Sequence, residues 1–133
     1  MNYPIATTSE QSKRLLKCNV EPETADMVCE GNKILGLTFG RSIPNDKWEN
    51  VKKVKIMPSW SLSRLLQMLP LLLEEYYRLV MGPVGNAWVI EYNDINITDC
   101  ILKSVAADPV ECAVQTIEWL TAEGYKLNEI KKK

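Results

Sequence analysis

The fold of this chain is decided by the stretch between residues 76 and 102, which reads YYRLVMGPVGNAWVIEYNDINITDCIL. Two runs rich in β-branched and aromatic residues, 76–81 and 87–92, flank a turn at 82–86, and a third run follows at 97–102. Short connections made of Gly, Pro, Asn and Asp between such runs are typical of hairpins. The sequence therefore predicts three consecutive antiparallel strands that form a β-meander.

A helix is predicted directly after the meander, over residues 108–124. Asp108 can cap its first turn, Pro109 suits the first helical position, and Gly124 can end it. Its apolar face is broad enough to cover a sheet and consists of Val110, Ala113, Val114, Ile117 and Leu120. We therefore expect this helix to bury that face in the core.

The first half of the chain is predicted to contain shorter elements. Thr8 and Gln11 have the spacing of a capping box and predict a helix over 9–18. Further elements are expected at 23–29 (a short helix), at 33–39 and 51–57 (strands), and at 62–69 (a helix capped by Ser61).

The predicted order of elements is α-α-β-β-α-β-β-β-α. A meander flanked by helices favours the α+β class, with an antiparallel sheet covered by helices. The 133 residues contain no internal repeat and no Gly/Ser-rich linker. We therefore expect a single domain over 1–133, with frayed ends at 1–7 and 126–133.

The composition limits the chemistry that the chain can carry out. It is 46% hydrophobic and 25% charged, and its formal net charge of -1 gives no general attraction to nucleic acid or to an anionic membrane. Histidine, the commonest general base and metal ligand, is absent. Phosphate-binding glycine motifs and a nucleophile elbow are also absent. We therefore expect no enzyme activity, no catalytic residue and no cofactor.

The cysteines and the N-terminus predict a compartment. Cys18, Cys29, Cys100 and Cys112 do not form the close pairs typical of zinc sites, and the N-terminus lacks the basic and apolar segments of a secretory signal. We therefore expect reduced thiols, no metal site and a cytoplasmic location. The longest mostly apolar stretch, 60–73, is interrupted by polar residues and is shorter than the roughly 20 residues that a membrane span needs, so we expect no membrane association.

Aromatic residues provide the candidate interaction surface. The chain has four tryptophans, Trp48, Trp60, Trp88 and Trp119, and five tyrosines. Tryptophan and tyrosine are favoured where a surface is partly buried against a partner. We therefore predict a protein-binding patch around the hairpin, with Trp88, Tyr76 and Arg78 as anchors on a shared sheet face. The alternative interpretation is that all four tryptophans pack in the core or at its edge.

Three segments together resemble a known group of proteins: TSEQSKRLLKCNVEPETADM (8–27), PSWSLSRLLQMLP (58–70) and DPVECAVQTIEWLTAEGY (108–125). In this order they are similar to small uncharacterised proteins of gut Bacteroidetes, which are often encoded in prophages or other mobile elements. The resemblance implies a bacterial, cytoplasmic protein with a phage or mobile-element role. It implies no activity, ligand or site residue.

Three functional hypotheses follow. The first is a non-enzymatic accessory or protein-interaction protein of a prophage or mobile element, either a monomer or a weak dimer. The alternative is a nucleic-acid-associated factor that uses the hairpin face, although the balanced charge does not favour nucleic acid as a partner. The third is an enzyme of unfamiliar type built on carboxylates.

Overall fold

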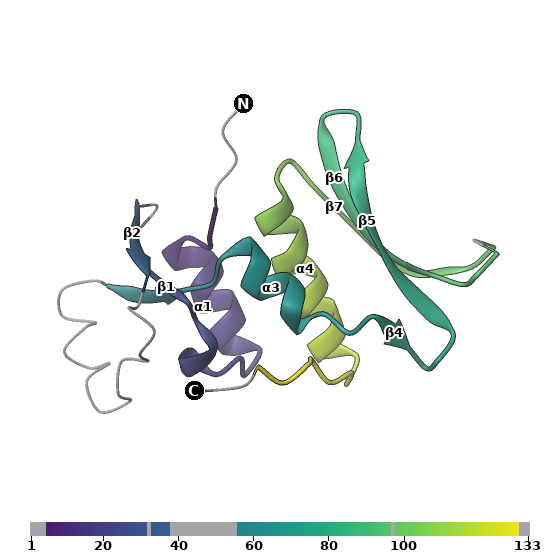
Figure 1. Ribbon diagram of the computed structural model, residues 1–133, viewed down its shortest axis with the longest axis horizontal. Coiled ribbons are helices and arrows are strands. Elements are labelled where there is room, and N and C mark those ends of the chain that lie inside the picture. The colour runs from purple at the N-terminus through teal and green to yellow at the C-terminus, as the bar shows by residue number, and fades with distance from the viewer. Residues whose placement is uncertain (1–4, 32, 38–55, 97, 131–133) are drawn as a thin grey trace.

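The computed structural model describes residues 5–31, 33–37, 56–96 and 98–130 (Figure 1). Its helices are α1 (Ser9–Lys17), α3 (Leu62–Met68) and α4 (Pro109–Ala122), with a 3-10 helix, η1 (Pro22–Thr24). Its strands are β1 (Met27–Glu30), β2 (Lys33–Leu37), β3 (Met57–Ser59), β4 (Leu72–Leu73), β5 (Tyr77–Val84), β6 (Ala87–Asn93) and β7 (Cys100–Ala106). Figure 1 shows the helices as a layer between two sheets.

The α+β class and the predicted order of helices and strands are confirmed. The strands form two antiparallel sheets, one in the order β2-β1-β3 and one in the order β4-β5-β6-β7. The predicted meander is the β5-β6-β7 part of the second sheet, and the two-residue strand β4 extends it at one side. Helix α4 packs on β6 and β7.

The first hairpin turn is shorter than the five-residue turn predicted at 82–86. Val84 already pairs with Ala87, so only Gly85 and Asn86 form the turn. Gly85 has a φ of 60°, and glycine at the first position of a two-residue turn matches the twist of the flanking strands. Strand β5 therefore continues through the Gly-Pro pair that the sequence placed in the turn.

The third strand of the meander begins at Cys100, whereas the sequence predicted a strand over 97–102, of which residue 97 lies outside the described residues. The carboxylate of Asp94 accounts for the difference. Its Oδ1 accepts hydrogen bonds from the backbone N–H groups of Thr98 (2.6 Å) and Asp99 (3.0 Å). An aspartate that binds backbone groups a few residues ahead favours a turn over a strand, so pairing with β6 starts later.

The second helix predicted at 23–29 is wrong in its extent. Only the 3-10 helix η1 forms, and Ala25 after it has an extended backbone, with φ -67° and ψ 140°. Residues Met27–Glu30 form strand β1, in which Met27 and Cys29 are buried and alternate with more exposed neighbours. The alternation has a period of two, which fits a strand with one face in the core.

The helices predicted at 9–18 and 62–69 are confirmed, and each ends one residue earlier than predicted. Thr8 and Gln11 form the capping box of α1, and Ser61 and Asp108 cap α3 and α4. The strand predicted at 33–39 corresponds to β2, with residues 38 and 39 outside the described residues. Most of the strand predicted at 51–57 also lies outside them, and the described strand β3 begins at its last residue.

The core lies around α4, whose predicted apolar face is fully buried. Trp60 and Tyr92 are the largest fully buried side chains, and each has a hydrogen bond for its polar group. The indole N–H of Trp60 donates to Thr24 Oγ1 (2.9 Å), and the hydroxyl of Tyr92 donates to the backbone O of Pro70 (2.8 Å). These bonds offset the cost of burying polar atoms.

Both chain ends that the sequence predicted to be frayed are packed on the fold in their described parts. Ala6 and Thr7 are fully buried. At the other end, Leu127 and Ile130 pack against the core, and the Nδ2 of Asn128 donates to the backbone oxygens at the end of α3.

Candidate protein interface

The four-stranded sheet has one covered face and one open face. Directly paired residues of neighbouring strands point to the same side of a sheet. The register therefore places Leu79, Met81, Ile90, Tyr92 and Leu102 on one face, together with Trp88. That face packs against the core, and Figure 1 shows the helical layer on this side of the sheet.

The opposite side, which we call the open face, is formed by residues from all four strands. Its rows follow from the pairing: Leu72 with Arg78, Val80 with Glu91 and Lys103, Gly82 with Val89 and Val105, and Val84 with Ala87. Four of the eight exposed large hydrophobic side chains in the described chain lie here: Leu72 (52% exposed), Val80 (46%), Val84 (65%) and Val105 (49%). Exposed aliphatic side chains gathered on one surface are typical of an interaction site.

Strand β5 is apolar on both sides of the sheet between Leu79 and Val84. Strand β5 directs Leu79 and Met81 to the core and Val80 and Val84 to the open face. Strands with one face in water usually alternate apolar and polar residues, whereas strands covered on both faces are apolar throughout. The β5 part of the open face is therefore more apolar than is usual for a sheet face in water.

Polar groups occupy one half of the open face. Glu91 accepts a hydrogen bond from Asn93 Nδ2 (2.7 Å) and lies 3.8 Å from the Nζ of Lys103. Arg78 is exposed, and within the described residues its side chain forms no hydrogen bond or ion pair. Asn93 is buried, and its Oδ1 has no hydrogen-bond partner in the part of the chain that the structure describes.

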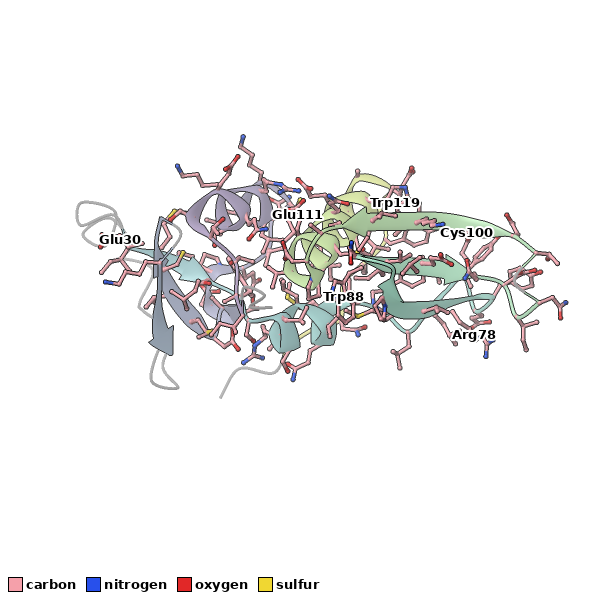
Figure 2. All side chains as sticks on the ribbon, turned by 90° about the horizontal axis from the view of Figure 1, so that it is seen from above. Glu30, Arg78, Trp88, Cys100, Glu111 and Trp119 are labelled. Atoms are coloured by element: carbon pink, nitrogen blue, oxygen red, sulfur yellow. The ribbon has the colours of Figure 1, made fainter. Side chains whose placement is uncertain are left out.

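The three predicted anchor residues do not share one face. Arg78 lies on the open face, whereas Trp88 pairs with Pro83 and therefore points to the covered side. Figure 2 shows Trp88 close to the helical layer and Arg78 farther from it. Tyr76 lies just before β5, is 53% exposed, and has its hydroxyl 3.5 Å from Asp94 Oδ2. The prediction that Trp88, Tyr76 and Arg78 share one sheet face is therefore wrong, because Trp88 and Arg78 lie on opposite faces.

The described tryptophans pack in the core or at its edge. Trp60 is fully buried, and Trp88 and Trp119 are partly buried against the core. Trp119 also stacks on Tyr125, with ring centroids 5.7 Å apart. Trp48 lies outside the described residues. For these three tryptophans, the structure supports the alternative interpretation of the aromatic set.

A polar cluster lies where β6 ends. The hydroxyl of Tyr77 donates to Asp99 Oδ2 (3.0 Å), and this hydrogen bond raises the pKa of Tyr77 to about 12. Hydrogen bonds from Thr98 and from the backbone of Asp99 lower the pKa of Asp94. Both shifts follow from hydrogen bonds that join Tyr77 to Asp99 and Asp94 to Thr98 and Asp99, so the cluster has a structural role.

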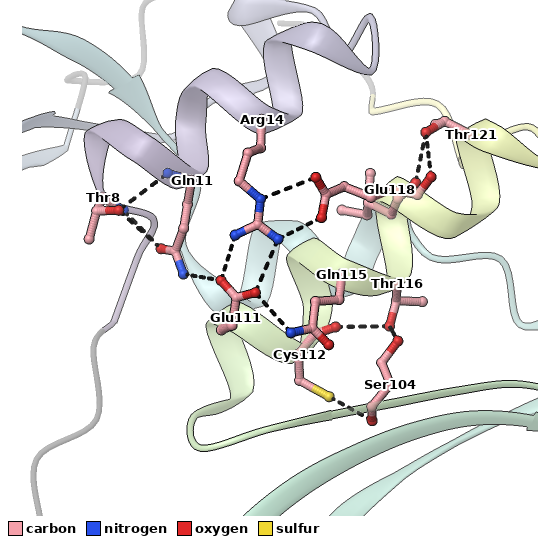
Figure 3. A network of polar contacts seen from close by, with 11 residues as sticks. Thr8, Gln11, Arg14, Ser104, Glu111, Cys112, Gln115, Thr116, Glu118 and Thr121 are labelled. Atoms are coloured by element: carbon pink, nitrogen blue, oxygen red, sulfur yellow. Dashed lines mark hydrogen bonds and ion pairs between the residues drawn. The ribbon is translucent and has the colours of Figure 1, made fainter.

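A second polar network joins α1 to α4 (Figure 3). Arg14 forms hydrogen bonds with both Glu111 and Glu118, and Gln11 and Gln115 also donate to Glu111. Burial acts to raise the pKa of Glu111, but the hydrogen bonds from Arg14 and the two glutamines outweigh it and hold the pKa below its ordinary value. This network has a structural role, because it fastens the first helix to the last.

The cysteines and the acidic side chains provide no further site in the described residues. The four cysteines form no disulfide with one another. Within residues 5–31, 33–37, 56–96 and 98–130, no group of three or more acidic or cysteine side chains is placed to hold a metal ion. The helices in the same ranges are too short or too polar to cross a bilayer.

Fold and surface together define an α+β protein with two antiparallel sheets and one open, aliphatic sheet face. Comparison with protein-family models, curated proteins and solved structures found no significant match. The similarity to proteins of gut Bacteroidetes therefore stays a prediction from the sequence. The open face is the candidate functional surface of the described chain.

The sequence contained a pattern that indicates this surface, but the prediction was based on the aromatic residues instead. In the run RLVMGPV (78–84), apolar residues occupy both alternating positions, which is unusual for a strand with one wet face. Valine is common in strands whether or not its side chain is covered. The run therefore indicates a second apolar face only after the strand register is known.

Proposed function

We propose that this chain is a non-enzymatic protein-interaction protein whose binding surface is the open face of the β4-β5-β6-β7 sheet. One observation carries the proposal: the exposed aliphatic side chains of Leu72, Val80, Val84 and Val105 lie together on an uncovered sheet face. Burying apolar area of this kind is the main favourable term in protein association.

The bacterial and mobile-element setting belongs to the same proposal. It is supported by the three sequence segments at 8–27, 58–70 and 108–125 and by nothing else. A cytoplasmic accessory protein that acts by binding another protein would fit both this setting and the absence of histidine from the sequence.

The open face supports protein binding better than nucleic-acid binding. Single-stranded nucleic acid is bound by aromatic side chains that stack on bases, beside a continuous basic groove. Trp88 points to the covered side of the sheet, and Lys103 is paired with Glu91. Aliphatic side chains between these charges offer no stacking platform.

A capture experiment with matched variants tests the proposal. Val84 on the open face and Ile95 in the loop after β6 are both 65% exposed. Wild-type protein, Val84→Lys and Ile95→Lys are immobilised, incubated with an extract of the source organism, and the bound proteins are identified by mass spectrometry. We expect wild type and Ile95→Lys to retain the same protein from the extract, which is either another copy of this chain or a different protein. We expect Val84→Lys to lose that protein. Equal retention by all three would refute the proposal.

A further inference from the structure

We infer that the outer edge of strand β7 accepts an extended segment of a partner protein, which adds to the β4-β5-β6-β7 sheet as a further strand. The inference rests on the proposed function, because it presupposes a protein partner and names the form of the chain that meets the sheet. The contact that it assigns is made by backbone groups at the edge, whereas the proposed function concerns side chains of the open face.

The direction of the backbone groups in this sheet follows from the turn between β5 and β6. Val84 and Ala87 flank the two-residue turn, so their N–H and C=O groups bond to each other. Along an antiparallel strand these groups point to alternate sides. The N–H of Leu79 accordingly points away from β6 and donates to the backbone O of Leu71 (3.0 Å). On β6, the same alternation directs three residues towards β7: Trp88, Ile90 and Tyr92.

In β7 the alternation leaves two residues that face outward. The partners of the three β6 residues are Ala106, Ser104 and Leu102. Lys103 and Val105 lie between them, so their backbone groups point away from β6. Within the described residues β7 pairs with β6 alone, and the backbone groups of Lys103 and Val105 have no hydrogen-bond partner. A row of unpaired N–H and C=O groups is a template for the extended backbone of another chain.

The two edges of the sheet differ in how they are protected. At the opposite edge, β4 has only two residues and covers the beginning of β5. Beyond β4, Pro83 has no N–H to donate, and a proline at an edge discourages the addition of a strand. Strand β7 has seven residues, contains neither proline nor glycine, and pairs regularly with β6 from Leu102 to Ala106. The edge of β7 is therefore the one at which this sheet can be extended.

Lys103 does not block this edge. A lysine on an edge strand usually opposes strand addition, because its charge would have to be covered. The Nζ of Lys103 lies 3.8 Å from Glu91 Oε1, and Glu91 is on the inner neighbour β6. The side chain of Lys103 thus extends over the open face towards β6, where its charge has a partner. An added strand can reach the backbone of Lys103 without burying an unpaired charge.

Val105 sets a requirement for one side chain of the partner segment. Its side chain lies on the open face and is 49% exposed. The residue opposite Val105 on an added strand would point to the same face, and β-branched or aromatic residues form favourable cross-strand pairs. A helix has no unpaired backbone groups along its length to offer to the edge, whereas strand addition uses them all. The partner is therefore an extended segment with a β-branched or aromatic residue opposite Val105.

Two substitutions of Val105 separate backbone contact from side-chain contact. Val105→Pro removes the outward N–H, whereas Val105→Ala shortens the side chain and keeps the N–H. Proline is tolerated at an edge position whose N–H points to solvent, so we expect both variants to fold, as circular dichroism would show. Both are immobilised and incubated with an extract of the source organism. We expect Val105→Pro to bind the protein retained by wild type at least about tenfold more weakly than Val105→Ala does. Equal binding by the two variants would overturn the inference.

Hydrogen exchange of the wild-type protein provides a readout that does not depend on a variant. In dilute solution we expect the backbone N–H groups of Lys103 and Val105 to exchange quickly, and that of Ser104 slowly. In the extract, exchange at Lys103 and Val105 should slow at least about tenfold, whereas exchange at the exposed Lys126 should not change. Nuclear magnetic resonance of isotopically labelled protein measures each rate. Unchanged rates at Lys103 and Val105 would overturn strand addition.

The two proposals fail in different ways. If Val84→Lys loses the retained protein while Val105→Pro binds it as Val105→Ala does, the open face stands and strand addition is refuted. If Val105→Pro loses that protein and Val84→Lys keeps it, strand addition stands and the open face is refuted as the binding surface. If neither substitution changes binding, both proposals are refuted.

Discussion

Arg14 on α1 donates two hydrogen bonds to the carboxylate of Glu111 on α4, at 2.8 and 3.0 Å, and two more to Glu118. The side chains of Arg14 and Glu111 are 30% and 24% exposed, so solvent screens this contact less than a pair on the open surface. Bidentate arginine–carboxylate pairs are among the stronger polar contacts. The first and last helices are therefore joined by a polar contact as well as by packing.

Replacing Arg14 should reduce stability. We expect Arg14→Met, which keeps most of the apolar stem, to lower the free energy of unfolding by about 1–3 kcal/mol, because Glu111 loses a charged partner. Urea denaturation measures the change. Lys13→Met removes the same charge from an exposed position on α1 and should change stability by less than about 0.5 kcal/mol. Equal effects of both substitutions would mean that the network contributes nothing specific.

Acid should weaken the same contact. The pKa of Glu111 is lowered in the folded state, so its contribution is fully present above the pKa of the unfolded chain and is lost as pH falls through the folded value. We therefore expect the stability of wild type to fall more steeply than that of Glu111→Gln as pH drops below about 4, the usual range of a glutamate. Thermal melts at a series of pH values measure both slopes. Parallel curves would contradict the assignment.

The helix ends and the last helix could be predicted from the sequence because their signals are local. Thr8, Ser61 and Asp108 act within three residues of themselves, and α4 carries its apolar period in one continuous segment. Strand β1 pairs on one side with β2, which follows it directly, and on the other side with Pro58 and Ser59 of β3, which lie far away in the chain. Local preference cannot identify such a partner.

The face of Trp88 could not be predicted for a related reason. Side chains of a strand alternate between two faces, so the face of a residue depends on the register of the pair. The register is set by the Gly85–Asn86 turn, and the sequence alone suggested a longer turn. The contact between Arg14 and Glu111 joins residues 97 positions apart and has no local signal at all.

The side chain of Asn128 should stabilise the end of α3. Its Nδ2 donates to the backbone oxygens of Gln67 (3.1 Å) and Leu69 (3.0 Å), which have no partner inside the helix. We expect Asn128→Asp, which keeps the size but loses the donor, to lower the free energy of unfolding by about 1 kcal/mol. Chemical denaturation of this variant and of Glu129→Gln, a change at the neighbouring exposed residue, provides the comparison. No difference between them would contradict the capping role.

A substitution in the turn between β4 and β5 should raise the stability of the protein. Glu74 and Glu75 both have positive φ angles, 55° and 58°, which L-residues adopt at a cost of roughly 1–2 kcal/mol each. Glycine has no such cost, so we expect Glu75→Gly to raise the melting temperature. Glu74→Gly should gain less, because Glu74 accepts a hydrogen bond from Tyr125 (3.1 Å). Loss of stability in Glu75→Gly would show that the turn is not strained.

The central claim is that the open face of the β4-β5-β6-β7 sheet is covered by protein where this chain functions. Thiol labelling measures this directly, with Val105→Cys on the open face and Ile95→Cys off it, each in a Cys100→Ser background. We predict that Val105→Cys is labelled at least about ten times more slowly in concentrated protein or in an extract of the source organism than in dilute solution, while Ile95→Cys is unchanged. Equal labelling rates for Val105→Cys under all three conditions would contradict the claim.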